Sequence, residues 1–155
     1  MKYPIGIQDF KTVRTNDYFY ADKSALLYKL VKSGQFYFFT RPRRFGKSLL
    51  LSALKAYWEG RKDLFAGLEI EKLEADNPDA WHPYPVFYFD FNGANYNDSD
   101  ALECILNEHL DRWEEKYDIT PEKEQTLGSR FRNLIIAASN ISLTIGAASG
   151  SIISL

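Results

Sequence analysis

The order of three segments constrains the fold of this chain more than any other feature. Residues 35–40 (QFYFFT) form an aromatic run that predicts a short buried strand. Residues 41–46 contain Pro and Gly and predict a loop. Residues 47–59 then show helical periodicity, with leucines and aromatic side chains on one face and polar side chains on the other. A strand, a glycine-containing loop and an amphipathic helix in this order predict an α/β unit.

The loop ends in the sequence FGKS, which resembles a phosphate-binding loop. That pattern is G-x-x-x-x-G-K-[ST] between a strand and a helix, and residues 41–48 fill the same window with Arg41 in place of the first glycine. In such a loop, backbone N–H groups and the positive end of the helix surround an anion. Gly46 would allow close backbone approach, Lys47 would neutralise the outer phosphates, and Ser48 would ligate Mg²⁺. A Gly-Lys-Ser tripeptide also occurs by chance as a turn before a helix, but the predicted flanking elements favour a true phosphate site.

The residues that we expect to hold the nucleotide are consecutive. They are Arg44, Phe45, Gly46, Lys47, Ser48 and Leu49. Arg43 could add a charge-assisted contact to a phosphate.

Two carboxylates could lie near this site. Asp22 precedes a predicted helix, and Asp90 is near the end of a second aromatic run, VFYFDF, where it could be imagined as a carboxylate for magnesium. Their simpler interpretations are a helix cap for Asp22 and a polar strand end for Asp90. We assign no catalytic residue, because no Ser, His and Asp combination suggests a hydrolase triad.

Five motifs follow one another along the chain. They are PIGIQDF (4–10), YFYADKS (18–24), RPRRFGKSLL (41–50), GRKDLFAGLEI (60–70) and YPV (84–86). Together they resemble the N-terminal half of the bacterial AAA-ATPase-like family, in which the loop usually reads RPRRFGKS. The resemblance extends to about Ala138 and implies ATP as the ligand. It also implies a P-loop NTPase fold, which is a three-layer α/β sandwich with a mainly parallel sheet. Longer relatives often continue into a nuclease-like domain.

The end of the chain departs from this resemblance. We expect an AAA-ATPase-like domain over residues 1–138 and an atypical uncharged tail over residues 139–155, which contains no carboxylate side chain. The family resemblance implies a strand ending in Asp-Glu at this place, which would hold Mg²⁺ through water and position the attacking water. Its absence predicts a C-terminally incomplete fold that binds Mg-ATP with little or no hydrolysis. The change in composition is interpreted as a truncation or a reading-frame change.

Periodicity predicts further elements along the chain. We expect helices over residues 23–32, 47–59, 62–65, 98–117 and 121–138, strands over residues 36–39 and 86–91, and an irregular lead-in over residues 3–22. Residues 141–145 could form another strand.

Composition restricts the class of protein and leaves two rival functions open. The 19 basic and 21 acidic residues give a net charge of −2, which argues against a general polyanion binder. A single cysteine, Cys104, and the lack of an apolar leader or membrane-length segment predict a cytoplasmic protein without a membrane partner. One rival is an inert fragment. The other is a nucleic-acid-binding module that uses Arg41, Arg43 and Arg44, although we do not expect nucleic acid as a partner of this chain alone.

Overall fold

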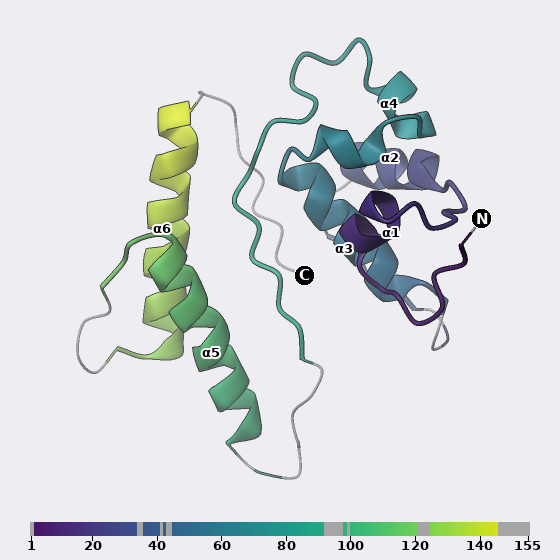
Figure 1. The fold of residues 1–155 in the computed structure, drawn as a ribbon. Coiled ribbons are helices and arrows are strands. Elements are labelled where there is room, and N and C mark those ends of the chain that lie inside the picture. The colour runs from purple at the N-terminus through teal and green to yellow at the C-terminus, as the bar shows by residue number, and fades with distance from the viewer. Residues whose placement is uncertain are drawn as a thin grey trace. The chain divides into compact units, whose positions relative to one another are not determined.

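The computed structural model describes residues 2–33, 36–40, 42, 45–91, 98, 100–120 and 125–145, which are mainly helical (Figure 1). The chain separates into two compact units, Met1–Val86 and Phe87–Leu155. The first unit contains α1 (Phe10–Thr15), α2 (Ser24–Ser33), α3 (Lys47–Trp58), the 3-10 helix η1 (Lys62–Phe65) and α4 (Glu69–Leu73). The second contains α5 (Ala101–Lys116) and α6 (Leu127–Ile145).

The prediction of a three-layer α/β sandwich with a mainly parallel sheet is wrong. Helices account for 54% of the structure and strands for 2%, and no sheet is present among the described residues. Residues 36–40 have no strand pairing, and within residues 86–91 only Phe87 has an isolated bridge. A strand is stable only beside other strands that accept and donate its backbone hydrogen bonds. Without such neighbours, Phe36 and Phe38 are 89% and 91% exposed, although both were expected in a core.

Helical periodicity gives better predictions than the aromatic runs. The helices expected over 23–32, 47–59, 62–65 and 98–117 are confirmed as α2, α3, η1 and α5, with ends shifted by no more than a few residues. Helix α6 begins at Leu127 rather than at residue 121. It continues to Ile145, so residues 141–145 are helical and the strand considered there is wrong. Helices α1 and α4 were not predicted, because six and five residues are too few to show a period.

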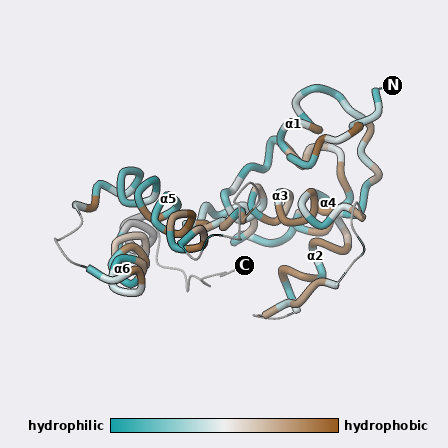
Figure 2. Tube along the Cα trace, turned by 90° about the horizontal axis from the view of Figure 1, so that it is seen from below, coloured by the Kyte–Doolittle hydropathy of each residue, from teal (hydrophilic) through white to brown (hydrophobic). Residues whose placement is uncertain are grey.

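The core of the first unit is built around α3. Ala53, Leu54, Ala56 and Tyr57 are buried on its inner face, and hydrophobic residues follow much of its length (Figure 2). The other buried members of this core come from α1, α2, η1, α4 and the turn before α4: Phe10, Leu27, Leu64, Phe65, Leu68 and Ile70. Burying this apolar surface, at roughly 25 cal/mol per Å², drives the short helices onto α3.

A buried carboxylate fixes the C-terminal part of this core. Glu74 accepts a hydrogen bond of 2.7 Å from the Tyr57 hydroxyl and another from the Asn77 amide, and it lies 3.5 Å from the ammonium group of Lys32. Burial, followed by the hydrogen bond to Glu74, raises the pKa of Tyr57, so the hydroxyl stays protonated as a donor. A buried charge is tolerated only with such partners.

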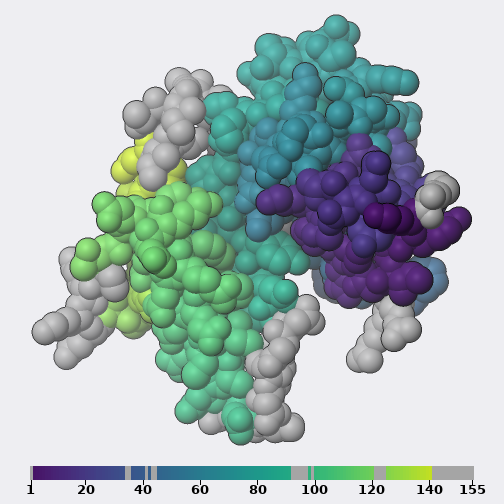
Figure 3. All heavy atoms as spheres, viewed as in Figure 1, coloured from purple at the N-terminus to yellow at the C-terminus, as the bar shows by residue number. Residues whose placement is uncertain are grey.

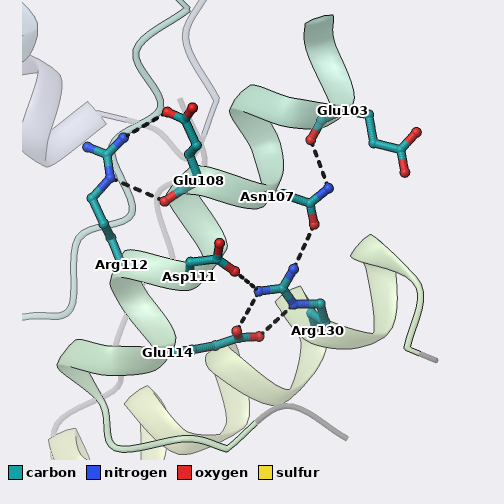
Figure 4. A network of polar contacts seen from close by, with 7 residues as sticks. All are labelled: Glu103, Asn107, Glu108, Asp111, Arg112, Glu114 and Arg130. Carbon is teal, nitrogen blue, oxygen red and sulfur yellow. Dashed lines mark hydrogen bonds and ion pairs between the residues drawn. The ribbon is translucent and has the colours of Figure 1, made fainter. Parts of the chain in front are cut away.

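The second unit is held by a small core and one arginine. Phe87, Leu110, Leu134 and Ala138 are buried together. Arg130 of α6 donates to both carboxylate oxygens of Glu114 on α5, at 2.9 and 2.5 Å (Figure 4). It also donates to Asn107 at 2.7 Å and to Asp111 at 2.5 Å, both on α5. Glu114 is only 4% exposed, so its charge needs a partner, and Arg130 provides one.

Replacing Arg130 should therefore destabilise the second unit far more than replacing an exposed arginine. Arg130→Met leaves the buried Glu114 carboxylate without its cation, and we expect a loss of about 3 kcal/mol in the free energy of unfolding. The control is Arg112→Met, which removes an exposed pair with Glu108 at 3.6 Å and should cost less than about 0.5 kcal/mol. Urea denaturation followed by circular dichroism measures both. Equal losses for the two variants would contradict the role assigned to Arg130.

Candidate functional site

The loop before α3 ends in a glycine whose backbone lies in the left-handed region. Gly46 has φ 75° and ψ 22° and is the N-cap of α3. A side chain in this conformation costs about 1–2 kcal/mol. A Cβ atom at Gly46 would meet no atom of the described residues within 4 Å, so packing against that part of the chain does not demand glycine here. The left-handed backbone conformation explains the glycine.

The charges at the start of α3 favour an anion. Lys47 and Ser48 are its first two residues, the first turn contains no acidic residue, and the N-cap residue is a glycine, which has no side chain to cap the helix. The first N–H groups of a helix have no intrahelical partner and carry a partial positive charge. Lys47, which is exposed, adds a full positive charge to the same end. A nearby anion would be stabilised by both, by roughly 0.3–1 kcal/mol from the helix dipole alone.

The structure describes five of the six residues predicted to hold the nucleotide. Phe45 precedes the helix and is 64% exposed, Ser48 is half-buried, and Leu49 packs against the core of the first unit. Arg44 lies outside the described residues, as do Arg41 and Arg43. The binding roles of all of these residues stay predictions.

A cavity of about 280 Å³ adjoins this loop, and three separated sequence motifs line it. Its walls are formed by Pro4, Phe19, Tyr20, Ala21, Lys23, Leu26, Phe45, Gly46, Leu49 and Leu50. Residues from motifs 4–10, 18–24 and 41–50 thus meet at one place. The sequence analysis assigned no binding role to the first six of these residues. Five of the six lie in motifs of the family resemblance, which could have pointed to them, whereas Leu26 lies outside those motifs.

The N-terminal wall of the cavity is a closed loop. Lys2 pairs with Tyr18 in a parallel bridge, the Phe19 N–H donates to the Lys2 carbonyl at 2.7 Å, and the rings of Tyr3 and Phe19 lie 5.8 Å apart. These contacts close residues 2–19 around α1. The cavity wall therefore belongs to a folded element rather than to a free end.

Ser52 anchors this loop to α3. Its hydroxyl accepts the Phe10 N–H at 2.9 Å and donates to Asp9 Oδ1 at 3.0 Å. The other oxygen of Asp9 accepts the N–H and the hydroxyl of Thr12, at 2.7 and 2.6 Å, and so caps α1. In the space-filling view, the N-terminal residues lie against those of α3 (Figure 3). Ser52 follows Ser48 by about one helical turn, so this anchor acts close to the start of the helix.

Hydrogen bonding keeps Asp9 ionised. Burial raises the pKa of this carboxyl, but the hydrogen bonds from Thr12 and Ser52, with help from the charge of Lys55, outweigh burial and lower the pKa below its ordinary value of 3.8. The ionised form is the better acceptor for all of these donors.

Asp22 is engaged within the protein. Its carboxylate accepts the Ser24 N–H at 2.8 Å at the start of α2 and the Glu69 N–H at 2.8 Å at the start of α4. Burial raises its pKa, but these hydrogen bonds and the charge of Arg14 outweigh burial and lower it. The geometry agrees with the helix-cap interpretation, while a role toward nucleotide stays a prediction.

Asp90 belongs to the second compact unit. Its backbone N–H and carbonyl both lie within hydrogen-bonding distance of His109 Nε2, at 3.2 and 3.1 Å. Its proposed place near the nucleotide site also stays a prediction.

Other chemistry has little support in the described part of the chain. No three His, Cys, Asp or Glu side chains among those residues lie together as a metal site would require. Cys104 is exposed and reduced. No helix among the described residues is both long enough and apolar enough to cross a membrane.

Comparison with known proteins supports the resemblance drawn from the five motifs. The sequence model of a family described as predicted AAA-ATPase matches residues 4–144. A protein of Azotobacter chroococcum mcd 1, described as an uncharacterized protein in the vnfD 5′ region, is 40% identical over 110 residues. These residues make up 70% of this chain and 20% of that relative, so the chain spans about one fifth of the relative's length. No solved structure matches the chain.

The anchor at Asp9 predicts a pH-dependent contribution to stability. Asp9→Ala removes the α1 cap and one partner of Ser52, and should cost about 1 kcal/mol at pH 7. Because the folded-state pKa of Asp9 lies below 3.8, the charged form stabilises the fold above that pH, and this contribution is lost as pH falls through the folded-state pKa. Urea denaturation at pH 7 and pH 3 measures the difference from wild type, with exposed Asp76→Ala as the control. A loss that is the same at both pH values would contradict the assignment.

Proposed function

The chain belongs to the AAA-ATPase-like family, and from this premise we propose that it binds ATP with Mg²⁺ at the start of α3. One observation carries the proposal. The sequence Gly46-Lys47-Ser48 forms the left-handed N-cap and the first two residues of a 12-residue helix whose N-cap glycine has no side chain. A helix start of this kind, with a lysine and no acid in its first turn, is a favourable place for phosphate.

Each residue of the proposed site has a role that follows from its chemistry. The backbone N–H groups at the start of α3 would donate to phosphate oxygens. Lys47 would lie against the β- and γ-phosphates as a point charge, and the Ser48 hydroxyl would be a ligand of Mg²⁺. Arg44 and Arg43, which precede these residues in the sequence, would add charge-assisted hydrogen bonds. The bound metal would neutralise charge on the phosphates.

We propose further that these 155 residues bind ATP with little or no hydrolysis. Phosphoryl transfer needs a carboxylate that holds the metal and a residue that orients the attacking water. The last acidic residue of the sequence is Glu124, ahead of α6, and residues 139–155 contain none. Because the chain spans about one fifth of its relative, this proposal concerns the 155 residues and not the activity of a longer protein.

Removing the positive charge of Lys47 should weaken ATP binding. In calorimetry with Mg-ATP, we expect Lys47→Ala to lose about 1.5–3 kcal/mol of binding free energy, at least roughly tenfold in affinity, since it removes a charge-assisted contact to phosphate. The control is Lys29→Ala, an exposed lysine on α2 that lies outside the cavity. If the folded wild-type chain binds no ATP, the proposal fails and the inert fragment is the better interpretation. Equal losses for the two variants would instead indicate general electrostatic attraction.

Replacing Ser48 should reduce the effect of Mg²⁺ on ATP affinity more than it reduces ATP affinity without the metal. Ser48→Ala removes the proposed hydroxyl ligand of Mg²⁺. We expect the affinity for ATP measured with EDTA to stay close to that of wild type, and the increase in affinity on adding Mg²⁺ to shrink severalfold. Calorimetry with and without the metal separates these effects. A Ser48→Ala variant with an undiminished response to Mg²⁺ would exclude Ser48 as a ligand.

A further inference from the structure

We propose that the cavity beside the loop receives the purine base of the nucleotide and holds it by apolar contact rather than by base-specific hydrogen bonds. This inference rests on the proposed function, because it takes the phosphate site at the start of α3 as given. It adds the second half of the ligand and assigns a binding role to six lining residues that had none in the sequence analysis: Pro4, Phe19, Tyr20, Ala21, Lys23 and Leu26.

The cavity lies directly beside the proposed phosphate site. Phe45 and Gly46 line the cavity, and Gly46 also caps the helix at which the phosphates would bind. Leu49 and Leu50 continue the lining along the first turn of α3. The cavity thus begins where the proposed phosphate site ends. One ligand with a charged end and a flat apolar end could occupy both.

The lining is largely apolar. Phe19, Phe45 and Leu26 are large apolar side chains that stay exposed, with 40%, 64% and 38% of their surfaces accessible. All three meet at this cavity. Exposed apolar groups that gather in a concave site are typical of a ligand site rather than of ordinary surface. A purine ring would cover them and could stack on an aromatic face.

The described lining offers few polar groups to a base. Among the described residues that line the cavity, Tyr20 and Lys23 are the ones whose side chains carry polar groups, and none of these lining residues is Asn, Gln, Asp, Glu, Ser or Thr. Burial, followed by the charge of Asp22, raises the pKa of Tyr20, so its hydroxyl is neutral. Strong discrimination between similar ligands requires polar groups placed to hydrogen-bond one of them. This lining lacks a set of side chains that would separate adenine from guanine.

The cavity is small. Small-molecule sites usually enclose roughly 300–1,000 Å³, and this cavity of about 280 Å³ is just below that range. It suits one ring system rather than a whole nucleoside triphosphate. That size agrees with the phosphates lying outside it, over the start of α3.

Calorimetry with three probes tests the inference on the wild-type chain. The probes are ATP, GTP and inorganic tripolyphosphate, each with Mg²⁺. We expect ATP to bind roughly tenfold more tightly than tripolyphosphate, because only ATP has a base to stack. We expect GTP to bind within about tenfold of ATP. Tripolyphosphate that binds as tightly as ATP would overturn the base site but leave the phosphate site intact. If none of the three binds, the proposed function itself fails.

Two phenylalanine variants locate the base. Phe45→Ala should weaken ATP to about the affinity of tripolyphosphate and leave tripolyphosphate unchanged, whereas Lys47→Ala should weaken both probes. The control is Phe38→Ala, because Phe38 is 91% exposed and does not line the cavity. It should change neither affinity. Circular dichroism checks that each variant is folded. If Phe45→Ala weakens both probes equally, or neither, the base does not occupy this cavity.

Discussion

The hydroxyl of Ser52 is the contact on which the candidate site depends. It joins the backbone of Phe10 and the carboxylate of Asp9 to α3. Through these two bonds, the start of α1 is fixed against the helix that begins with Gly46-Lys47-Ser48. The loop that carries Pro4 and Phe19 is closed by its own pairing between Lys2 and Tyr18. Without the anchor at Ser52, this loop would be attached to α3 mainly by apolar contacts, which are not directional.

In each compact unit, a buried carboxylate holds neighbouring segments together through hydrogen bonds and an ion pair. Glu74 fixes the C-terminal part of the first core through Tyr57, Asn77 and Lys32. Glu114 joins α5 to α6 through Arg130 (Figure 4). A buried charge is costly to leave unpaired, so each carboxylate strongly favours the one arrangement that supplies its partners. Where helices are short and cores are small, such contacts fix how the helices pack on one another, which hydrophobic burial alone specifies less strictly.

The error in the predicted fold has a physical explanation in the two aromatic runs. Residues 36–40 and 86–91 are rich in the side chains that favour strands, and this pattern indicates a tendency to be extended and buried. It does not identify a partner strand, and backbone hydrogen bonds between strands are what make a sheet. A helix satisfies its N–H and C=O groups within one segment. That difference explains why α2, α3 and α5 were predicted well from periodicity while the sheet was not.

By itself, the sequence determined the helices with a clear period, the family of the chain and the start of α3 at Lys47, because all three are local patterns. Only the tertiary structure decided that Pro4, several of the residues from Phe19 to Leu26, and residues from the loop and first turn of α3 line one cavity, and that Asp22 serves two helix starts within the fold. It also decided that Ser52, which was expected on a polar helix face, anchors α1. The hydrogen bonds of Ser52 with Phe10 and of Asp22 with Glu69 join residues 42 and 47 positions apart along the chain. Periodicity and local propensity describe only a few helical turns at a time. They therefore cannot predict packing or hydrogen bonds between segments that are far apart in the sequence.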